Sequence, residues 1–236
     1  MRRASPFAAT IVLATCCVEC GGLLLARKVM TGHGGYGFLA WNLFLACVPL
    51  ALAAAADYVH RASGPGGTRT AAVGLLLVAW LLFFPNAPYL VTDLKHLIYR
   101  GWAAPAPDWY DAFLVGSFVA TGVAAGFASL LVVHGLVRHR LGRPAGAAAV
   151  AFASAAGGFA ICLGRFDRLN SWDAVSNPTW LLRTVARYAF SPHEHPRVLA
   201  VTLLYGGFIA MGYATLLALA GLRDAAPPAG QGGLRE

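Results

Sequence analysis

Two segments of this chain gather the side chains that can bind a ligand or move a proton. Six of the ten acidic residues fall within residues 85–111 and 164–197, close to arginine, histidine and asparagine. We expect a polar site built from residues 85–111 and 164–178. Its candidate binding residues are Asn86, Asp93, His96, Asp111, Arg165, Asp167, Arg168, Asn170 and Asp173.

In the first segment, Asp93 and His96 are three residues apart, a spacing that puts both on one face of a helix. A carboxylate beside an imidazole can share a proton or hold a metal ion, or it can form only a local cap and charge contact. Asp93 and His96 are therefore candidates for catalysis and for metal binding, and Asp173 is a further catalytic candidate. The sequence assigns no cofactor.

The second segment contains two arginines, Arg165 and Arg168, beside Asp167, Asn170 and Asp173. Arginine is the preferred partner of carboxylates and phosphates, because its planar guanidinium donates two parallel hydrogen bonds. Pairing of the arginines with aspartates of the same loops explains these residues equally well, and Asp173 can instead cap the segment that follows. The pattern indicates either an anion site or a set of internal ion pairs.

The composition of the whole chain indicates a membrane protein. Of its 236 residues, 58% are hydrophobic and 12% are charged, whereas soluble domains carry about 25% charged residues. A transmembrane helix needs about 20 apolar residues. We therefore predict an all-α, polytopic membrane bundle with six spans, near residues 6–26, 36–57, 70–86, 111–134, 145–164 and 198–221.

The two ends of the chain and one amphipathic segment complete the predicted organisation. The first span resembles a signal sequence but is long, so we expect it to remain as an uncleaved span. A short amphipathic helix near residues 179–190 is expected to lie in the membrane interface. We expect residues 1–224 to form one transmembrane domain and residues 225–236 to form a disordered tail.

Prolines interrupt the third span. Pro85 and Pro88 remove backbone donors and restrict the residues before them. We expect the helix to break at Phe84–Ala87 and to restart at Thr92, whose hydroxyl can cap it. Broken backbone at membrane depth is found where it is buried in protein or lines a wet cavity. If the helices alternate strictly, the segments after the third and fifth spans share one side of the membrane, which brings the two polar segments to one face.

Orientation in the membrane depends on the positions of lysine and arginine. The two sides are nearly equal in these residues, but the count favours cytoplasmic termini once the arginines of residues 164–197 are treated as site residues. We expect a multi-pass protein of the cell membrane with both termini in the cytoplasm. Within the spans, Glu19, Asn42 and His134 are the polar outliers, and ionisable residues at bilayer depth are candidates for function.

The expected partners are membrane lipids. The net charge of +8 favours anionic lipids, and no basic stripe with interleaved aromatic residues predicts nucleic-acid binding. Gly122 and Gly126 have the spacing of a helix-pairing motif. The spacing indicates either a face for a homo-oligomer or another membrane partner, or only the glycine- and alanine-rich composition. The five cysteines fall within the spans and are interpreted as packing thiols.

Three phrases of the sequence are specific enough to suggest a family. They are the proline–asparagine block at residues 84–94, the Trp-Tyr-Asp triplet at residues 109–111, and the Arg-Phe-Asp-Arg-Leu-Asn-Ser-Trp-Asp block at residues 165–173. In this order they resemble a bacterial integral-membrane family known as domain of unknown function 1361, over roughly residues 40–220. The resemblance implies a polytopic bacterial membrane protein, and it implies no established activity, substrate or catalytic residue.

Three functions remain open from the sequence. The first is a site that binds an anionic lipid or a metal, with or without catalysis. The second is a transporter or channel that uses the broken third span. The third is a structural or assembly factor whose polar loops hold each other. No glycine-rich nucleotide loop, GxSxG motif or HExxH motif is present, so ATP-driven, serine-hydrolase and zinc-protease functions lack support.

Overall fold

The computed structural model describes residues 6–62, 64, 66–98 and 106–225. These residues form helices and turns and no strand, which confirms the predicted all-α fold. Six segments of this described chain are long and apolar enough to cross a membrane. Their long helices are α1 (Pro6–Thr31), α2 (Phe38–Ala62), α3 (Gly67–Phe83), α5 (Asp108–Leu141), α6 (Arg143–Cys162) and α9 (Pro196–Ala225). The tail expected at residues 225–236 lies outside the described residues, except that Ala225 is the last residue of α9.

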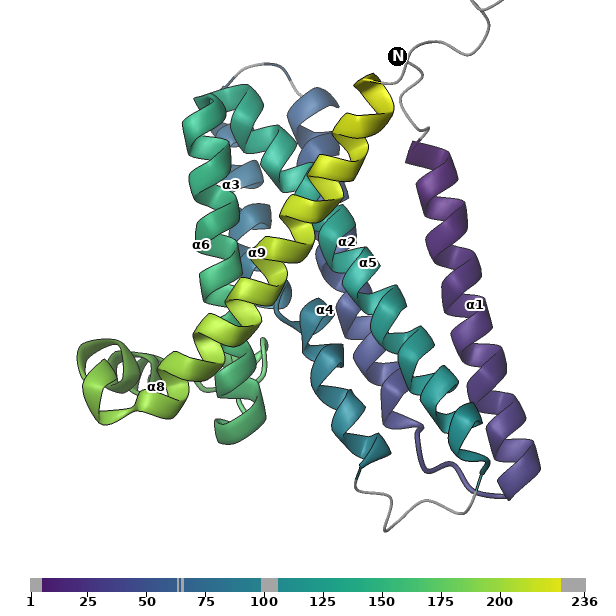
Figure 1. Cartoon of the computed structure of the whole chain (residues 1–236). Helices are drawn as coiled ribbons and strands as arrows, with labels where there is room; N and C mark the ends of the chain where they lie inside the picture. Colours follow the sequence, from purple (N-terminus) through teal and green to yellow (C-terminus); the bar gives the residue numbers. More distant parts are fainter. Residues whose placement is uncertain (1–5, 63, 65, 99–105, 226–236) are drawn as a thin grey trace, which may run out of the picture.

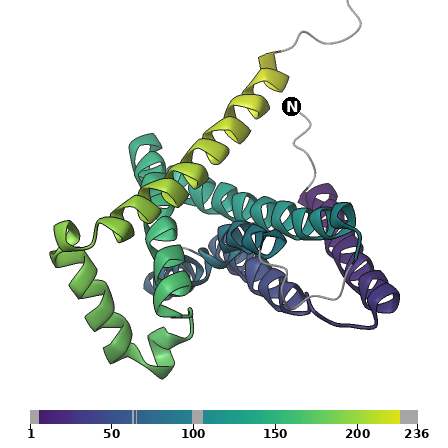
Figure 2. The same ribbon diagram turned by 60° about the horizontal axis from the view of Figure 1, so that its bottom comes forward.

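The helices form a bundle with α5 near its middle (Figure 1). α5 contacts α1 and α2 on one side and α6 on the other, and α9 packs along α6. The start of α1 and the end of α9 lie at the same end of the bundle, as six spans require (Figure 1). At the opposite end, α8 (Pro178–Phe190) extends sideways from α6 and α9, away from α1 (Figures 1 and 2). It coincides with the predicted amphipathic helix.

Small residues bring α6 and α9 close together. A Cβ atom at Gly158 of α6 would lie against the backbone of Thr202 and Gly206, and a Cβ at Gly206 would lie 3.0 Å from the Ser154 carbonyl oxygen. Such close approach raises the number of van der Waals contacts, which drive helix association in lipid. Backbone contact at this crossing therefore depends on glycine.

Gly122 and Gly126 of α5 pack within the chain. A Cβ at Gly122 would meet the side chain of Leu90 and lie 3.3 Å from the carbonyl oxygen of Ala87, and a Cβ at Gly126 would lie 2.8 Å from the Cβ of Ala87. The glycine pair accommodates the segment that follows the break in the third span. Its interpretation as a face for a second protein is therefore wrong, because the face is already covered.

The third span breaks where the prolines predict. α3 ends at Phe83, a turn contains Phe84 and Pro85, and α4 (Asn86–Tyr89) leads into the 3₁₀ helix η1 (Leu90–Leu97). The predicted restart at Thr92 is wrong, because helical backbone resumes at Asn86. Pro88 permits this early restart, since the N–H that proline lacks has no partner in the first turn of a helix. Thr92 is buried inside η1 and caps nothing.

We predict that Gly158→Ala lowers the free energy of unfolding by about 1–3 kcal/mol, because the added methyl forces α6 and α9 apart. Gly207→Ala is the matched control, since a Cβ there has no neighbour within 4 Å. Thermal and denaturant unfolding of the full chain in detergent micelles measures both. Equal stability of the two variants would contradict a glycine-dependent crossing.

Candidate functional site

A cavity of about 570 Å³ lies between α2, the broken third span, the end of α6 and α8. Both polar segments predicted from the sequence contribute to its wall. Of the predicted residues, the wall includes Asn86, Asp93, His96, Arg165 and Asn170. Asp111, Asp167, Arg168 and Asp173 are not among the lining residues. The cavity therefore brings together five of the nine candidate binding residues.

Asn86 and Ser171 join the two polar segments directly. The Asn86 side-chain amide donates to the Phe83 carbonyl oxygen at 2.9 Å and to the Ser171 hydroxyl oxygen at 2.9 Å. The Ser171 hydroxyl in turn donates to the carbonyl oxygen of Leu82 at 2.7 Å. Both carbonyls belong to the last turn of α3, where the break leaves backbone acceptors in need of donors. We call this set of bonds the Asn86–Ser171 bridge.

Asp93 is the buried acid of the cavity wall. It is 2% exposed, and its Oδ2 accepts a hydrogen bond of 2.8 Å from the Asn42 side-chain amide of α2. His96 Nε2 lies 3.9 Å from Asp93 Oδ1, which is longer than a hydrogen bond. The His96 ring packs against Phe38, with 4.8 Å between the ring centroids. One oxygen of Asp93 is thus fixed, and the other faces an imidazole across a short gap.

Asn42 was not predicted as a site residue. Its only sequence signal is a polar side chain inside an apolar run, and that signal does not identify Asp93 as its partner 51 residues away.

As for metal ions, within the described residues no group of three or more His, Cys, Asp or Glu side chains comes together. Metal binding by Asp93 and His96 stays a prediction.

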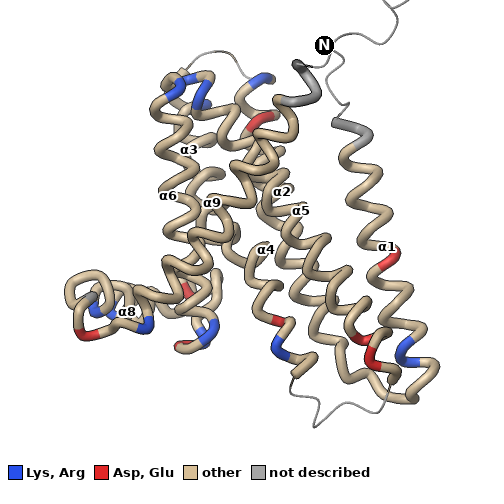
Figure 3. Tube along the Cα trace, in the orientation of Figure 1, with Lys and Arg blue, Asp and Glu red and all other residues tan. Residues whose placement is uncertain are grey.

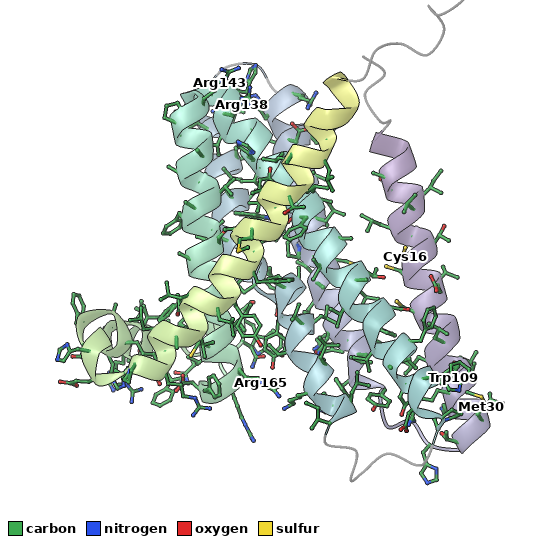
Figure 4. All side chains as sticks on the ribbon, viewed as in Figure 1. Cys16, Met30, Trp109, Arg138, Arg143 and Arg165 are labelled. Carbon is green, nitrogen blue, oxygen red and sulfur yellow. The ribbon has the colours of Figure 1, made fainter. Side chains whose placement is uncertain are left out.

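Arg165 reaches the cavity from η2 (Leu163–Asp167), a π-helical turn that continues α6. Figure 4 shows it beneath α6, between the ribbons of α8 and α4. Its Nη1 donates to the Tyr89 hydroxyl at 3.4 Å. Arg168 ends the turn in a left-handed conformation, with φ of 57°, and its side chain is exposed. The two arginines of the motif therefore differ in position, and only Arg165 lines the cavity.

The remaining residues of the second segment hold local structure. The Tyr188 hydroxyl of α8 donates to Asp167 at 2.9 and 3.2 Å. Burial raises the pKa of Tyr188, and the hydrogen bond and charge of Asp167 raise it further, so the phenol stays protonated and keeps donating. Asp173 accepts the backbone N–H of Asn170 at 2.6 Å and the Ser176 hydroxyl at 3.2 Å. These bonds hold the turn that leads into α7 (Asp173–Ser176), but they do not cap that helix, because its N-cap residue is Trp172 and has no side-chain hydrogen bond.

Asp111 lies at a different place, in a buried ion pair with Arg27 of α1. Each residue is 1% exposed. Arg27 Nε donates to Oδ1 at 2.7 Å and Nη2 donates to Oδ2 at 3.2 Å, and the guanidinium lies 4.5 Å from the centre of the Tyr36 ring. Arg27 was not predicted as a site residue, because at the end of the first span it counts only as one of the arginines used to judge orientation. The missed signal is that Arg27 ends the first span and Asp111 begins the fourth, which puts both at the same side of the membrane.

We predict that Asp111→Asn costs about 3–5 kcal/mol of unfolding free energy, because it leaves the buried charge of Arg27 without its carboxylate. The control is Asp57→Asn, which breaks the more exposed Asp57–Arg61 pair and is expected to cost less than about 1 kcal/mol. Denaturant titration in micelles compares the two. A similar small loss in both variants would contradict a stabilising role for the buried pair.

We also predict that Ser171→Ala costs about 1 kcal/mol, because it removes the donor to Leu82 and the acceptor of Asn86. Ser176→Ala, on the exposed turn that follows, is expected to stay within about 0.5 kcal/mol of the unchanged chain. Proteolysis between α6 and α8 adds a local measurement, since loss of the Asn86–Ser171 bridge is expected to speed cleavage there. Unchanged cleavage in Ser171→Ala would contradict its role in holding this segment.

Comparison with known proteins agrees with the resemblance seen in the sequence. One family model matches residues 41–211, a range that includes every residue of the cavity wall named above except Phe38. No curated protein and no solved structure matches the chain. The match covers well over half of the chain, so this protein belongs to the family described as "Protein of unknown function (DUF1361)".

Proposed function

We propose that this protein binds a membrane amphiphile with an anionic head group, of the kind an anionic phospholipid presents, in the cavity between the broken third span and α8. The observation that carries the proposal is that the lining of the cavity combines cations with an apolar surface. Lys95 and Arg165 line the same cavity as a large apolar surface from α6 and α8. A cavity of about 570 Å³ is within the usual range for small-ligand sites.

The charges of the cavity favour an anion. Lys95 and Arg165 are both half-buried, and within the described part of the chain neither forms an ion pair with a carboxylate. Asp93 is the acid on this wall, and one of its oxygens is already occupied by Asn42. Half-buried cations without carboxylate partners form strong, charge-assisted hydrogen bonds to phosphate or carboxylate oxygens. The head group is therefore expected near Arg165.

The apolar part of the wall suits an acyl or isoprenoid chain. Phe159 of α6 and Leu181, Leu182 and Val185 of α8 line the cavity. Leu182 is 66% exposed and Trp41 of α2 is 56% exposed, so the apolar lining continues onto the outer surface. A ligand with a polar head and a long apolar tail buries both kinds of surface, whereas a small soluble anion leaves the apolar lining exposed.

The position of the cavity supports a ligand taken from the bilayer. α8, which lines the cavity through Leu181, Leu182 and Val185, lies in the part of the bundle away from the start of α1 and the end of α9 (Figure 1). With α8 in the membrane interface and both termini in the cytoplasm, the site faces the outer leaflet of the cell membrane. Lipid head groups lie at this depth.

We predict that the full chain, purified in a neutral detergent, binds short-chain phosphatidic acid more tightly than short-chain phosphatidylcholine. Arg165→Gln is expected to weaken phosphatidic acid binding about tenfold, because a charge-assisted hydrogen bond is lost. Lys95→Gln is expected to act in the same direction. Native mass spectrometry or tryptophan fluorescence, with Trp172 in the cavity wall, measures both lipids.

The matched control is Arg183→Gln, since Arg183 is an exposed arginine of α8 that does not line the cavity. It is expected to bind phosphatidic acid like the unchanged chain. Equal binding of the two lipids, or equal loss in Arg165→Gln and Arg183→Gln, would refute a specific anionic-lipid site. Inorganic phosphate, added as a competitor, shows whether the site recognises a lipid or a free phosphate. For a lipid site, phosphate is expected to displace phosphatidic acid only at far higher concentration.

A further inference from the structure

α1 is the span with the least contact with the rest of the bundle. In the most apolar stretch of α1, 6% of the residues are buried inside the structure, compared with 44% in the corresponding stretch of α5. It lies at the edge of the bundle and packs mainly on α5 (Figures 1 and 2). Cys20 and Arg27 mark its inner face, since both are buried. The outer face of α1 remains open to the membrane.

Glu19 lies on this outer face at the middle of the span. It is the eleventh of the 23 residues from Ala9 to Thr31, and its side chain is exposed. Figure 3 shows the charged residues of the chain along the whole trace, with most lysines and arginines toward the ends of the long helices. Among the described residues none donates a hydrogen bond to it. Because hydrocarbon offers no donor either, an acid at this depth is costly without a protein partner.

The residues around Glu19 form a seam suited to another helix. Residues Val12, Thr15, Glu19, Gly22, Ala26 and Val29 follow one another at intervals of three and four, and all six are exposed. This is the seven-residue repeat of two helices that pack along their length. Thr15, Gly22 and Ala26 are small enough for backbones to approach closely, and a Cβ at Gly22 would have no neighbour within 4 Å.

A second copy of this chain can supply the hydrogen-bond partner that Glu19 lacks. Copies of one protein insert in the same orientation, so two α1 helices related by a twofold axis run parallel and residues of equal depth meet. Glu19 then faces Glu19 of the second copy. Two carboxyl groups at one site share a proton readily, because the protonated group donates to the ionised one. The drawn lysines and arginines of the long helices lie mainly toward the helix ends (Figure 3).

We propose that two copies of this protein associate through α1, with the two Glu19 side chains hydrogen-bonded across the seam. The proposal concerns a face separate from the lipid cavity, and it stands whether or not the cavity binds lipid. Small residues supply the close packing of the two helices, and the carboxyl pair fixes their register. The acid that is costly in a monomer is thereby satisfied in the dimer.

The test is dimer formation of the full chain in liposomes, measured by single-molecule photobleaching over a range of protein densities. The unchanged chain is expected to dimerise. Glu19→Leu and Gly22→Leu are each expected to weaken dimerisation by about tenfold, through loss of the hydrogen bond and of close approach respectively. Glu19→Gln is expected to stay within about twofold of the unchanged chain, since a Gln amide both donates and accepts.

The matched control is Thr215→Leu, which removes an exposed polar side chain from α9 and is expected to leave dimerisation unchanged. A monomer at every density would overturn the proposal, as would unchanged dimerisation of Glu19→Leu or of Gly22→Leu. Equal weakening by Thr215→Leu would place the contact elsewhere and overturn it too. A loss in Glu19→Gln as large as in Glu19→Leu would overturn the hydrogen-bonded pair.

Discussion

The need to satisfy backbone carbonyls at the break in the third span determines much of this structure. Pro85 and Pro88 interrupt the helix inside an apolar segment, which leaves carbonyls in the last turn of α3 without helical donors. The donors come instead from side chains, Asn86 to Phe83 and Ser171 to Leu82. Because Ser171 belongs to the segment after the fifth span, the same bonds hold that segment against the third span. The cavity forms at this junction, and α8 is placed beside it.

α5 connects the parts of the bundle through an ion pair, close packing at glycine and side-chain hydrogen bonds. α1 is joined by the Arg27–Asp111 ion pair, and α4 by contact with Gly122 and Gly126. Trp80 of α3 donates to Ser129 at 3.2 Å, and His134 is hydrogen-bonded to Tyr213 of α9 at 2.8 Å. Polar contacts between membrane helices each contribute about 1 kcal/mol, whereas an unpaired buried charge costs several. Of these interactions, the ion pair is therefore the least replaceable.

Local sequence patterns predicted the elements, but pairings between distant residues could not be predicted. Apolar runs predicted six spans, because the length and hydropathy of a span are local properties. The break at Pro85 was predicted for the same reason, and the error at Thr92 came from overlooking that Pro88 fits the first turn of α4. The Asn42–Asp93 bond and the Arg27–Asp111 pair depend on which faces of separate helices meet. The length and hydropathy of a span do not specify which of its faces meets which neighbour.

The Asn86–Ser171 bridge also has a consequence for biosynthesis. Ser171 is synthesised 89 residues after Leu82, the residue whose carbonyl it satisfies. At about 5–20 residues per second, the ribosome needs roughly 4–18 seconds to make that stretch. During this time the third span has already been made, but its break lacks the hydroxyl group that completes it. The third span therefore reaches its final form only after Ser171, which follows the fifth span, has been made.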